Sequence, residues 1–261
     1  MDHHNRDPAR LLTHLPLLRN ARDRLVDRSA LEADLEISRA TAYRQTTELV
    51  EEGLLEQTAG GYRTTGSGKA ALDAADRFER SLAAADRLGP LLEHLSTPEL
   101  TRNIYLFADA DLAVATPQNP NAPIEPWLDR FESFDYSRSL VVAGCPPAIT
   151  EQGVNHATND VDFEAVCTPL ALQADQNASK EAFETIATAE GPSLYTHPDL
   201  PFTMGIIDES VIIIGFDTET TLPVASITTD RPEALLWAKQ LYSQYKREST
   251  GLEEPTTKSL L

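Results

Sequence analysis

The chain has 261 residues and a formal net charge of −19, so it is long enough for two domains that each bury their own core. So negative a charge at first argues against binding to nucleic acid. The charge is uneven, however: residues 1–70 contain ten Lys/Arg and eleven Asp/Glu, a net of −1, and the remainder carries −18. The N-terminal quarter of the chain therefore has almost no net charge.

Only five of the 22 basic residues are lysines. Acid-rich, lysine-poor surfaces suit proteins that work in high salt, where dense charge is screened. The composition favours a halophilic archaeon as the source, and an ordinary acidic protein is the alternative. In molar salt, phosphate contacts gain little from counterion release, so binding to any nucleic acid would depend more on hydrogen bonds and shape.

The two cysteines, Cys145 and Cys167, form neither a disulfide framework nor a CxxC metal motif. Both lie in apolar, strand-like runs, which favours buried free thiols over a redox- or metal-sensing pair. The longest apolar run, around Val211–Ile214, is too short to span a membrane. The charged and polar segment Met1–Arg10 does not resemble a signal peptide, so we expect a cytoplasmic protein.

The N-terminal elements follow one another closely. Leucines at helical spacing predict a first helix in Pro8–Asp23, kinked or split by Pro16. Ser29 and Glu32 form a capping box that predicts a second helix start, and Glu36–Ser38 is a break with Ile37 as an apolar plug. Ser38 then caps a third helix over Arg39–Glu52.

Gly53 is suited to end this third helix in the left-handed conformation. Leu54–Thr58 and Tyr62–Thr65 flank Ala59-Gly60-Gly61 and predict a β-hairpin. Two helices with a three-residue break, followed by a hairpin, are the geometry that inserts a helix into a DNA major groove. The alternative is an ordinary helical hairpin that binds no DNA.

The string ISRATAYRQTTELVEEGLLE resembles the winged helix-turn-helix of archaeal and bacterial transcription regulators. This resemblance implies that Arg39–Glu52 is the recognition helix, with its core face at Ala42, Thr46, Leu49 and Val50. Arg39 or Arg44 is expected to read guanine bidentately, Tyr43 to reach a phosphate, and Arg63 to contact the minor groove or backbone. The predicted DNA-binding residues are Ser38, Arg39, Ala40, Thr41, Tyr43, Arg44, Thr47 and Arg63.

Ser67–Leu88 predicts a long helix with an apolar seam at 4-3-4-3 spacing. This seam either pairs with its copy in a second subunit, as a homodimer, or packs on its own chain. Gly89-Pro90 ends the helix, a short helix continues through Leu91–Leu95, and Thr97-Pro98 starts another. The predicted dimerisation residues are Ala71, Ala75, Phe78, Leu82 and Ala85.

The region Ile104–Arg247 has an α/β pattern. Its last strands form an antiparallel meander with acidic turns, and the helix Pro232–Lys246 closes the domain. The tail Glu248–Leu261 is polar and expected to be disordered. The predicted strands are Ile104–Phe107, Ala113–Thr116, Ser139–Ala143, Phe163–Val166, Phe202–Ile207, Val211–Phe216 and Pro223–Thr228, and the other predicted helices are Pro123–Phe134 and Lys180–Ala189.

A second resemblance covers about Glu99–Arg247. The strings LPFTMGIIDESVIIIGFD and VASITTDRPEALLWAKQLYSQYK are similar to the FilR-type regulatory domain, which follows winged helices in regulators of methanogenic and haloarchaea. It implies a one-component transcription regulator with an N-terminal DNA reader and a C-terminal sensor or oligomerisation domain. No ligand identity follows from it.

Catalytic patterns are missing from the sequence. None of the histidines lies in HExxH or opens an HxK pattern, and no glycine-rich phosphate loop is present. We therefore expect no enzyme, no metal and no cofactor. Trp127, Trp237 and Phe202 are candidates to line a ligand cavity, although core packing explains them more simply.

The predicted fold class is α+β or α/β. It comprises a winged helix-turn-helix (1–66), a linker with dimerisation helices (67–98), a mixed α/β sensor-like domain (99–247) and the tail (248–261). The predicted function is a homodimeric, sequence-specific DNA-binding regulator with double-stranded DNA and an unidentified small-molecule effector as partners. The alternatives are an interaction or scaffold protein that recruits a partner through the acidic domain, and an enzyme with an appended winged helix.

Overall fold

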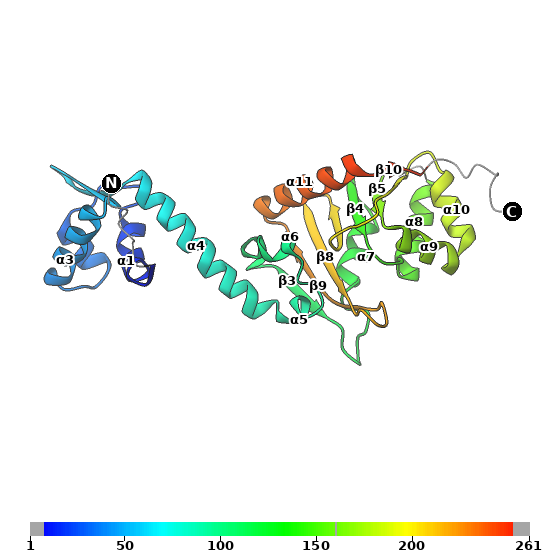
Figure 1. Ribbon diagram of the computed structural model, residues 1–261, viewed down its shortest axis with the longest axis horizontal. Coiled ribbons are helices and arrows are strands. Elements are labelled where there is room, and N and C mark those ends of the chain that lie inside the picture. The colour runs from blue at the N-terminus through cyan, green and yellow to red at the C-terminus, as the bar shows by residue number, and fades with distance from the viewer. Residues whose placement is uncertain (1–7, 160, 253–261) are drawn as a thin grey trace. The chain divides into compact units, whose positions relative to one another are not determined.

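The protein is described by a computed structural model that covers residues 8–159 and 161–252. The chain divides into two compact units, Met1–Arg80 and Ser81–Leu261, and each is considered by itself. The fold is mixed, with a largely helical first unit and a second unit built on a large sheet (Figure 1). None of the helices in the described part of the chain is long and apolar enough to cross a membrane.

The first unit consists of three helices and a β-hairpin, followed by the start of a long helix. Its core is a cluster of leucines that includes Leu18, Leu31, Leu49 and Leu72, all fully buried. α1 runs through Pro16 without being split. The elements are α1 (Pro8–Asn20), α2 (Arg28–Asp34), α3 (Arg39–Glu51), β1 (Leu55–Thr58), β2 (Gly61–Thr64) and α4 (Gly66–Arg87).

The prediction that Ser29 caps the second helix is wrong. Asp27 is the N-cap, and its carboxylate accepts a hydrogen bond of 2.8 Å from the backbone N–H of Ala30. The reason is tertiary: Val26 exchanges two backbone hydrogen bonds with Tyr62 of β2, which holds the chain extended just before Asp27. The helix therefore starts where this bridge ends, and Ser29 falls inside its first turn.

The boundaries of the third helix are confirmed, whereas α1 ends at Asn20, three residues before the predicted end. Ser38 caps α3 by accepting from the N–H of Thr41 at 3.1 Å. Gly53 adopts a φ of +69°, the left-handed conformation expected after the helix. Glu36 in the break before α3 also has a positive φ, of 54°, so the turn between α2 and α3 is tight.

The second unit is organised around an eight-stranded sheet in the order β10-β6-β5-β4-β7-β8-β9-β3. β4, β5 and β6 run parallel to one another, and the other neighbours are antiparallel. Its strands are β3 (Asp111–Val114), β4 (Ser137–Val141), β5 (Glu164–Cys167), β6 (Ser193–Thr196), β7 (Thr203–Ile207), β8 (Ser210–Phe216), β9 (Pro223–Thr229) and β10 (Thr250–Gly251). Its helices after α4 are α5 (Gly89–Leu92), α6 (Pro98–Thr101), the 3₁₀ helix η1 (Ile104–Phe107), α7 (Glu125–Phe131), α8 (Pro147–Thr158), α9 (Pro169–Ala178), α10 (Lys180–Thr188) and α11 (Pro232–Glu248).

The predicted meander is confirmed as β7, β8 and β9, and the closing helix as α11. The predicted strand at Ile104–Phe107 is wrong, because this segment is η1 and packs in the core. A short apolar run cannot be assigned to strand or helix by periodicity alone. The start of the polar tail forms β10 against β6, whereas residues 253–261 lie outside the described part of the chain.

Alternating side chains of the sheet enter different cores. Leu140, Val166 and Ile213 pack in the core that includes α11, whereas their neighbours point to the other face. There, Ile212 packs with α7 and α8, and Cys167 packs with α9. The central strands are therefore buried on both faces, which explains the apolar run of β8.

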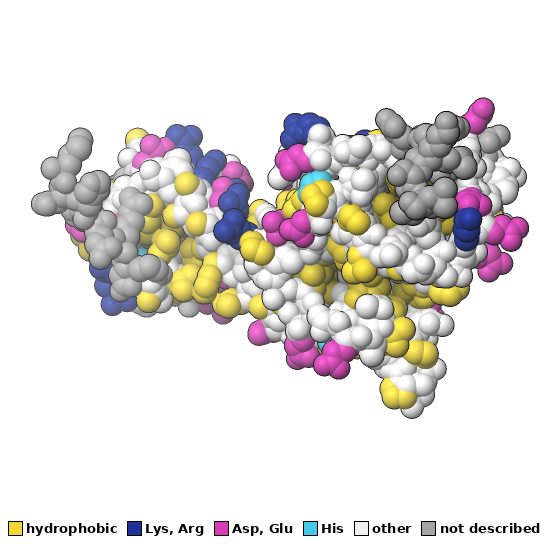
Figure 2. Space-filling view, turned by 45° about the vertical axis from the view of Figure 1, so that its right-hand side comes forward, with side chains coloured by type: hydrophobic (Ala, Val, Ile, Leu, Met, Phe, Trp, Pro, Cys, Tyr) yellow, Lys and Arg dark blue, Asp and Glu magenta, His cyan; other side chains and the backbone are white. Residues whose placement is uncertain are grey.

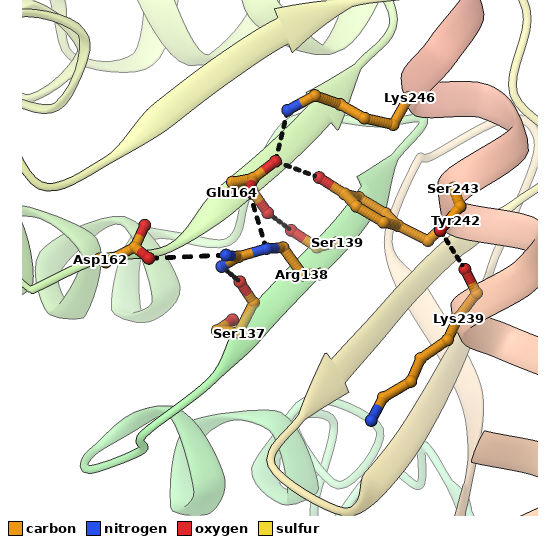
Figure 3. A network of polar contacts seen from close by, with 9 residues as sticks. All are labelled: Ser137, Arg138, Ser139, Asp162, Glu164, Lys239, Tyr242, Ser243 and Lys246. Atoms are coloured by element: carbon orange, nitrogen blue, oxygen red, sulfur yellow. Dashed lines mark hydrogen bonds and ion pairs between the residues drawn. The ribbon is translucent and has the colours of Figure 1, made fainter. Parts of the chain in front are cut away.

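A polar cluster fastens α11 to β4 and β5 (Figure 3). The Glu164 carboxylate accepts from the Tyr242 hydroxyl at 2.9 Å, pairs with Arg138 Nε at 2.9 Å and is also bonded by Lys246 Nζ. Lys246 Nζ lies 3.0 Å from the centre of the Tyr195 ring. Burial opposes the ionisation of Glu164, but the bonds from Lys246 and Tyr242 and the charge of Arg138 outweigh it and lower the pKa of Glu164.

We expect Glu164→Gln to lower the unfolding free energy of the second unit by about 1–3 kcal/mol, because three donors lose a charged acceptor. The native pKa is below the unfolded one, so this stabilisation is present above the unfolded value and is lost as pH falls through the native pKa. The variant should lack this acid-side loss. Urea titrations followed by tryptophan fluorescence measure the second unit, since Trp127 and Trp237 both lie in it.

Asp162→Asn is the matched control. Its contact with Arg138 is 3.5 Å long and its side chain is 68% exposed, so its loss should change stability by at most ~0.5 kcal/mol. Equal effects of the two substitutions would show that Glu164 is not the centre of the cluster.

Candidate nucleic-acid interface

The predicted core face of α3 is buried as expected: Ala42, Thr46 and Leu49 are inaccessible to solvent, and Val50 packs at the edge of the same core. Glu48 is turned toward α1, where it pairs with Arg10 at 2.7 Å. The packing of these residues fixes which side of α3 faces outward.

Arg39, Ala40 and Arg44 lie on that outward side and are exposed. Within residues 8–159 and 161–252, neither arginine is within ion-pairing distance of a carboxylate. Both guanidinium groups are therefore available to an outside acceptor such as a base edge or a phosphate.

The first turn of α3 is organised by hydroxyl groups. The hydroxyls of Ser38 and Thr41 lie 2.9 Å apart and share a hydrogen bond, in addition to the capping bond. The Thr47 hydroxyl donates to the carbonyl of Tyr43 at 2.8 Å, so its proton is used within the helix. Ser38 and Thr41 thus shape the start of α3, and Thr47 retains only acceptor capacity.

Arg28 is a residue of this surface that the sequence did not single out. Its guanidinium lies 4.8 Å from the ring centre of Tyr43 on α3 and 5.4 Å from that of Tyr62 on β2, and it donates to the Tyr62 hydroxyl. It joins α2, α3 and the hairpin, while Tyr43 remains 58% exposed. Contact between Arg28 and Tyr43 depends on the angle between two helices, which no local sequence pattern encodes.

Arg63 lies on β2 of the hairpin and pairs with Glu56 of β1 through Nε at 2.8 Å and Nη2 at 2.6 Å. This cross-strand pair neutralises much of its charge. On the face shown in Figure 2, Lys and Arg side chains form separate small groups with Asp and Glu side chains between them. The described residues on this face therefore form no continuous basic patch.

The predicted dimerisation seam on α4 is divided by the packing. Ala75 is buried in the core of the first unit and Ala71 packs at its edge. Phe78 and Leu82 are 51% and 52% exposed, and Ala85 is exposed as well. The exposed apolar part of the seam is therefore Phe78, Leu82 and Ala85.

The two cysteines are free thiols; Cys167 is buried and Cys145 is half-buried. Burial, followed by the charge of Asp175, raises the pKa of the Cys145 thiol strongly and that of Cys167 to about 12. Both thiols are consequently protonated at neutral pH, which disfavours redox chemistry that needs a thiolate. In the described ranges, no three His, Cys, Asp or Glu side chains gather closely enough to hold a metal ion.

The three aromatic residues considered as cavity lining have different environments. Trp237 belongs to α11 and packs with Phe202 in the core between this helix and the sheet, with ring centres 6.3 Å apart. The Trp237 ring also meets the Phe107 ring edge-on. Trp127, on the other face of the sheet, does line a cavity.

Two family models match this sequence. Residues 3–87 match the HVO_A0261 N-terminal domain, and residues 120–248 match the middle domain of the methanogenesis regulatory protein FilR1. No curated protein matches the sequence at a significant level.

Solved structures resemble the chain only remotely. TrmBL2, described as an archaeal chromatin protein with a novel mode of DNA binding, is 14% identical over 95% of this chain and 96% of its own, with a TM-score of 0.41. Nuc, a phospholipase D family member from Salmonella typhimurium, is 16% identical over 56% of this chain and 100% of its own, with a TM-score of 0.45. NucT from Helicobacter pylori is 12% identical over 55% and 99%, with a TM-score of 0.43.

Similarities this remote transfer neither the activity nor the DNA binding of those proteins. The family matches are more informative. The first, over residues 3–87, covers nearly all of the first unit, and the second, over residues 120–248, covers most of the second unit. Residues 3–87 are therefore similar to the HVO_A0261 N-terminal domain and residues 120–248 to the FilR1 middle domain, and together the two matches support an archaeal transcription regulator.

Proposed function

We propose that this protein is a sequence-specific transcription regulator that reads double-stranded DNA as a winged helix-turn-helix, with α3 in the major groove. The observation that carries the proposal is the selective pairing of its basic residues. Among the basic residues of the range 8–70, Arg28, Arg39 and Arg44 have no carboxylate partner, and all three lie on α2 or α3. The paired basic residues are Arg10, Arg19, Arg22, Arg24, Arg63 and Lys69.

The unpaired arginines suit different parts of DNA. Arg39 and Arg44 project from the N-terminal half of α3, the part of a recognition helix that normally meets base edges. Arg28 is held by two tyrosine rings beside α3 and suits a phosphate, because a fixed guanidinium loses little freedom on binding. Ser38 and Thr41 offer hydroxyls at the start of the helix, where phosphate is also favoured.

The acidity of the rest of the chain limits the interface to this region. Residues 71–261 carry a net charge of −18, which repels the phosphate backbone. DNA binding by α2 and α3 therefore depends on close, directional contacts, and in a halophilic setting long-range attraction would be screened in any case.

We further propose a homodimer. A single recognition helix contacts too few bases for high specificity, so helix-turn-helix proteins usually bind paired half-sites. Phe78 and Leu82 expose large apolar side chains on one face of α4, with Ala85 beside them. Pairing these residues with a second copy would remove them from water and set the separation of two recognition helices.

Arg44→Ala should weaken binding to the operator by about 1–3 kcal/mol, roughly 5- to 150-fold, and leave binding to random DNA nearly unchanged. Arg28→Ala should weaken binding to both DNAs, because a phosphate contact carries no sequence information. In vitro selection with the full chain supplies the operator, and gel shifts at a fixed salt concentration supply the affinities.

Arg22→Ala is the control for these variants, because Arg22 already forms an ion pair of 2.9 Å with Asp73. Its DNA affinity should remain within about twofold of the unmodified chain. If selection yields no preferred sequence, the regulator is disproved and the alternative of an acidic interaction protein gains support. An unchanged operator affinity of Arg44→Ala would remove Arg44 from the interface.

Phe78→Glu combined with Leu82→Glu should convert the dimer into monomers, because it would bury unpaired charge in the seam. Ala83→Glu, on an exposed position across α4, should leave the dimer intact. Light scattering at molar salt gives the mass of each. A monomeric unmodified chain contradicts the dimer, and a dimeric double variant places the contact elsewhere.

The melting temperature should fall as salt decreases from molar to about 0.1 M, where the Debye length grows from ~3 to ~10 Å and the acidic surface repels itself. Thermal melts in KCl measure this, and sucrose at matched osmolality controls for solvent exclusion. A melting temperature independent of salt would contradict the halophilic origin.

A further inference from the structure

The second unit contains a cavity of about 90 Å³ on the face of the sheet opposite α11. Its floor comes from the parallel strands β4, β5 and β6, and its other walls from the helices α7 to α10. The lining is mostly apolar and includes the rings of Trp127, Phe131 and Phe163. An apolar cavity of comparable size, ~150 Å³, stays dry and accepts small apolar molecules in an engineered protein.

Small residues keep this space open. Ala165 on β5 and Gly153 on α8 contribute little volume where larger side chains would fill the cavity. A Cβ added at Gly153 would meet Ile186 Cδ1 at 3.2 Å, so the helices pack closely around a glycine. The lining loses packing contacts across the void, which an occupant would restore.

One ionisable carboxyl interrupts the apolar wall. Asp175 on α9 lines the cavity and accepts from the backbone N–H of Cys145 at 2.6 Å. Burial raises the pKa of Asp175, although its bonds to Cys145 act in the opposite direction. A further donor brought by an occupant would compensate for the water that this carboxyl has lost.

The other groups of the wall argue against a charged occupant. The thiols of Cys145 and Cys167 are both in the lining, and their raised pKa values keep them neutral. Placing a full charge among aromatic and aliphatic side chains would cost more than a single partner returns. An uncharged molecule with one donor matches both the apolar lining and the carboxyl.

We propose that this cavity binds a small, uncharged, mostly apolar molecule whose single N–H or O–H group donates to Asp175. The role of this cavity as an effector site rests on the function proposed above. Its ability to bind such a molecule depends only on the cavity itself. The sequence resemblance assigned no ligand, whereas the lining specifies the chemical class of one.

Pyrrole and thiophene are matched probes, since both are five-membered aromatic rings and only pyrrole has an N–H donor. The chain supplies its own reporter and control, because it has two tryptophans and Trp127 lines the cavity whereas Trp237 packs in the opposite core. In ¹⁵N-labelled full chain, pyrrole should shift the indole N–H signal of Trp127 and leave that of Trp237 unmoved. Trp237→Phe assigns the two signals.

Thiophene should bind roughly 10- to 150-fold more weakly than pyrrole, the usual effect of a missing hydrogen bond to a charged group. Asp175→Asn keeps the shape and an acceptor for the Cys145 N–H, and should reduce the affinity for pyrrole to that for thiophene. Gly153→Leu fills the cavity and should abolish both titrations, with an unchanged Trp237 signal showing that the unit is folded.

An unmoved Trp127 signal, equal shifts of both tryptophans, or equal affinities for pyrrole and thiophene in the unmodified chain would each overturn the proposal. A pyrrole preference that survives in Asp175→Asn would do the same, even if Gly153→Leu failed to fold. Operator binding is measured on the unmodified chain without probe. A chain that binds its operator but no pyrrole refutes the cavity site alone, and one that binds pyrrole but no operator refutes the regulator alone.

Discussion

The second unit depends on a sheet whose central strands are buried on both faces. The central strands β4, β7 and β8 are covered on both faces, which explains why Val211–Ile214 is apolar throughout, and two separate cores form. One core receives α11 and is sealed by the cluster around Glu164. The other receives α7 to α10, whose packing is less complete and leaves the cavity. The cavity and the cluster around Glu164 therefore lie on opposite faces of the same strands.

Successive side chains along β4 and β5 point to opposite faces of the sheet, so the cluster and the cavity lie back to back. Arg138 and Glu164 belong to the charged cluster, and the residues that follow them, Ser139 and Ala165, line the cavity. The cluster holds β4 and β5 against α11 through side chains from three elements. The cluster therefore also supports the strands that form the floor of the cavity.

Much of the fold could be predicted where the signals were local. The cap at Ser38, the left-handed Gly53, the hairpin and the meander are all encoded within a few residues, and each is confirmed. The predictions failed where distant residues decide. The start of α2 is set by the bridge from Val26 to β2, and the apolar run Ile104–Phe107, which forms a 3₁₀ helix, has no periodicity that separates strand from helix.

The candidate sites show the same division. The outward face of α3 could be predicted because a helix has a fixed period, whereas the position of Arg28 between two rings depends on how α2, α3 and the hairpin pack. The helices α8 and α9 and the strand β6 were not predicted, and the cavity that they border was therefore not predicted either. Of its lining, only Trp127 was predicted as a cavity residue, and Cys145 and Cys167 were considered as buried or sensing thiols.

The helix α10 has a consequence for how fast this cavity can exchange its contents. It supplies Phe183 and Ile186 to the lining, yet none of its nine residues is fully buried. Moving α10 outward breaks less packing than moving a strand of the floor. Local opening of α10 therefore costs less free energy and gives access to the cavity. The residence time of an occupant would then depend on how often one short helix opens as well as on the affinity of the occupant.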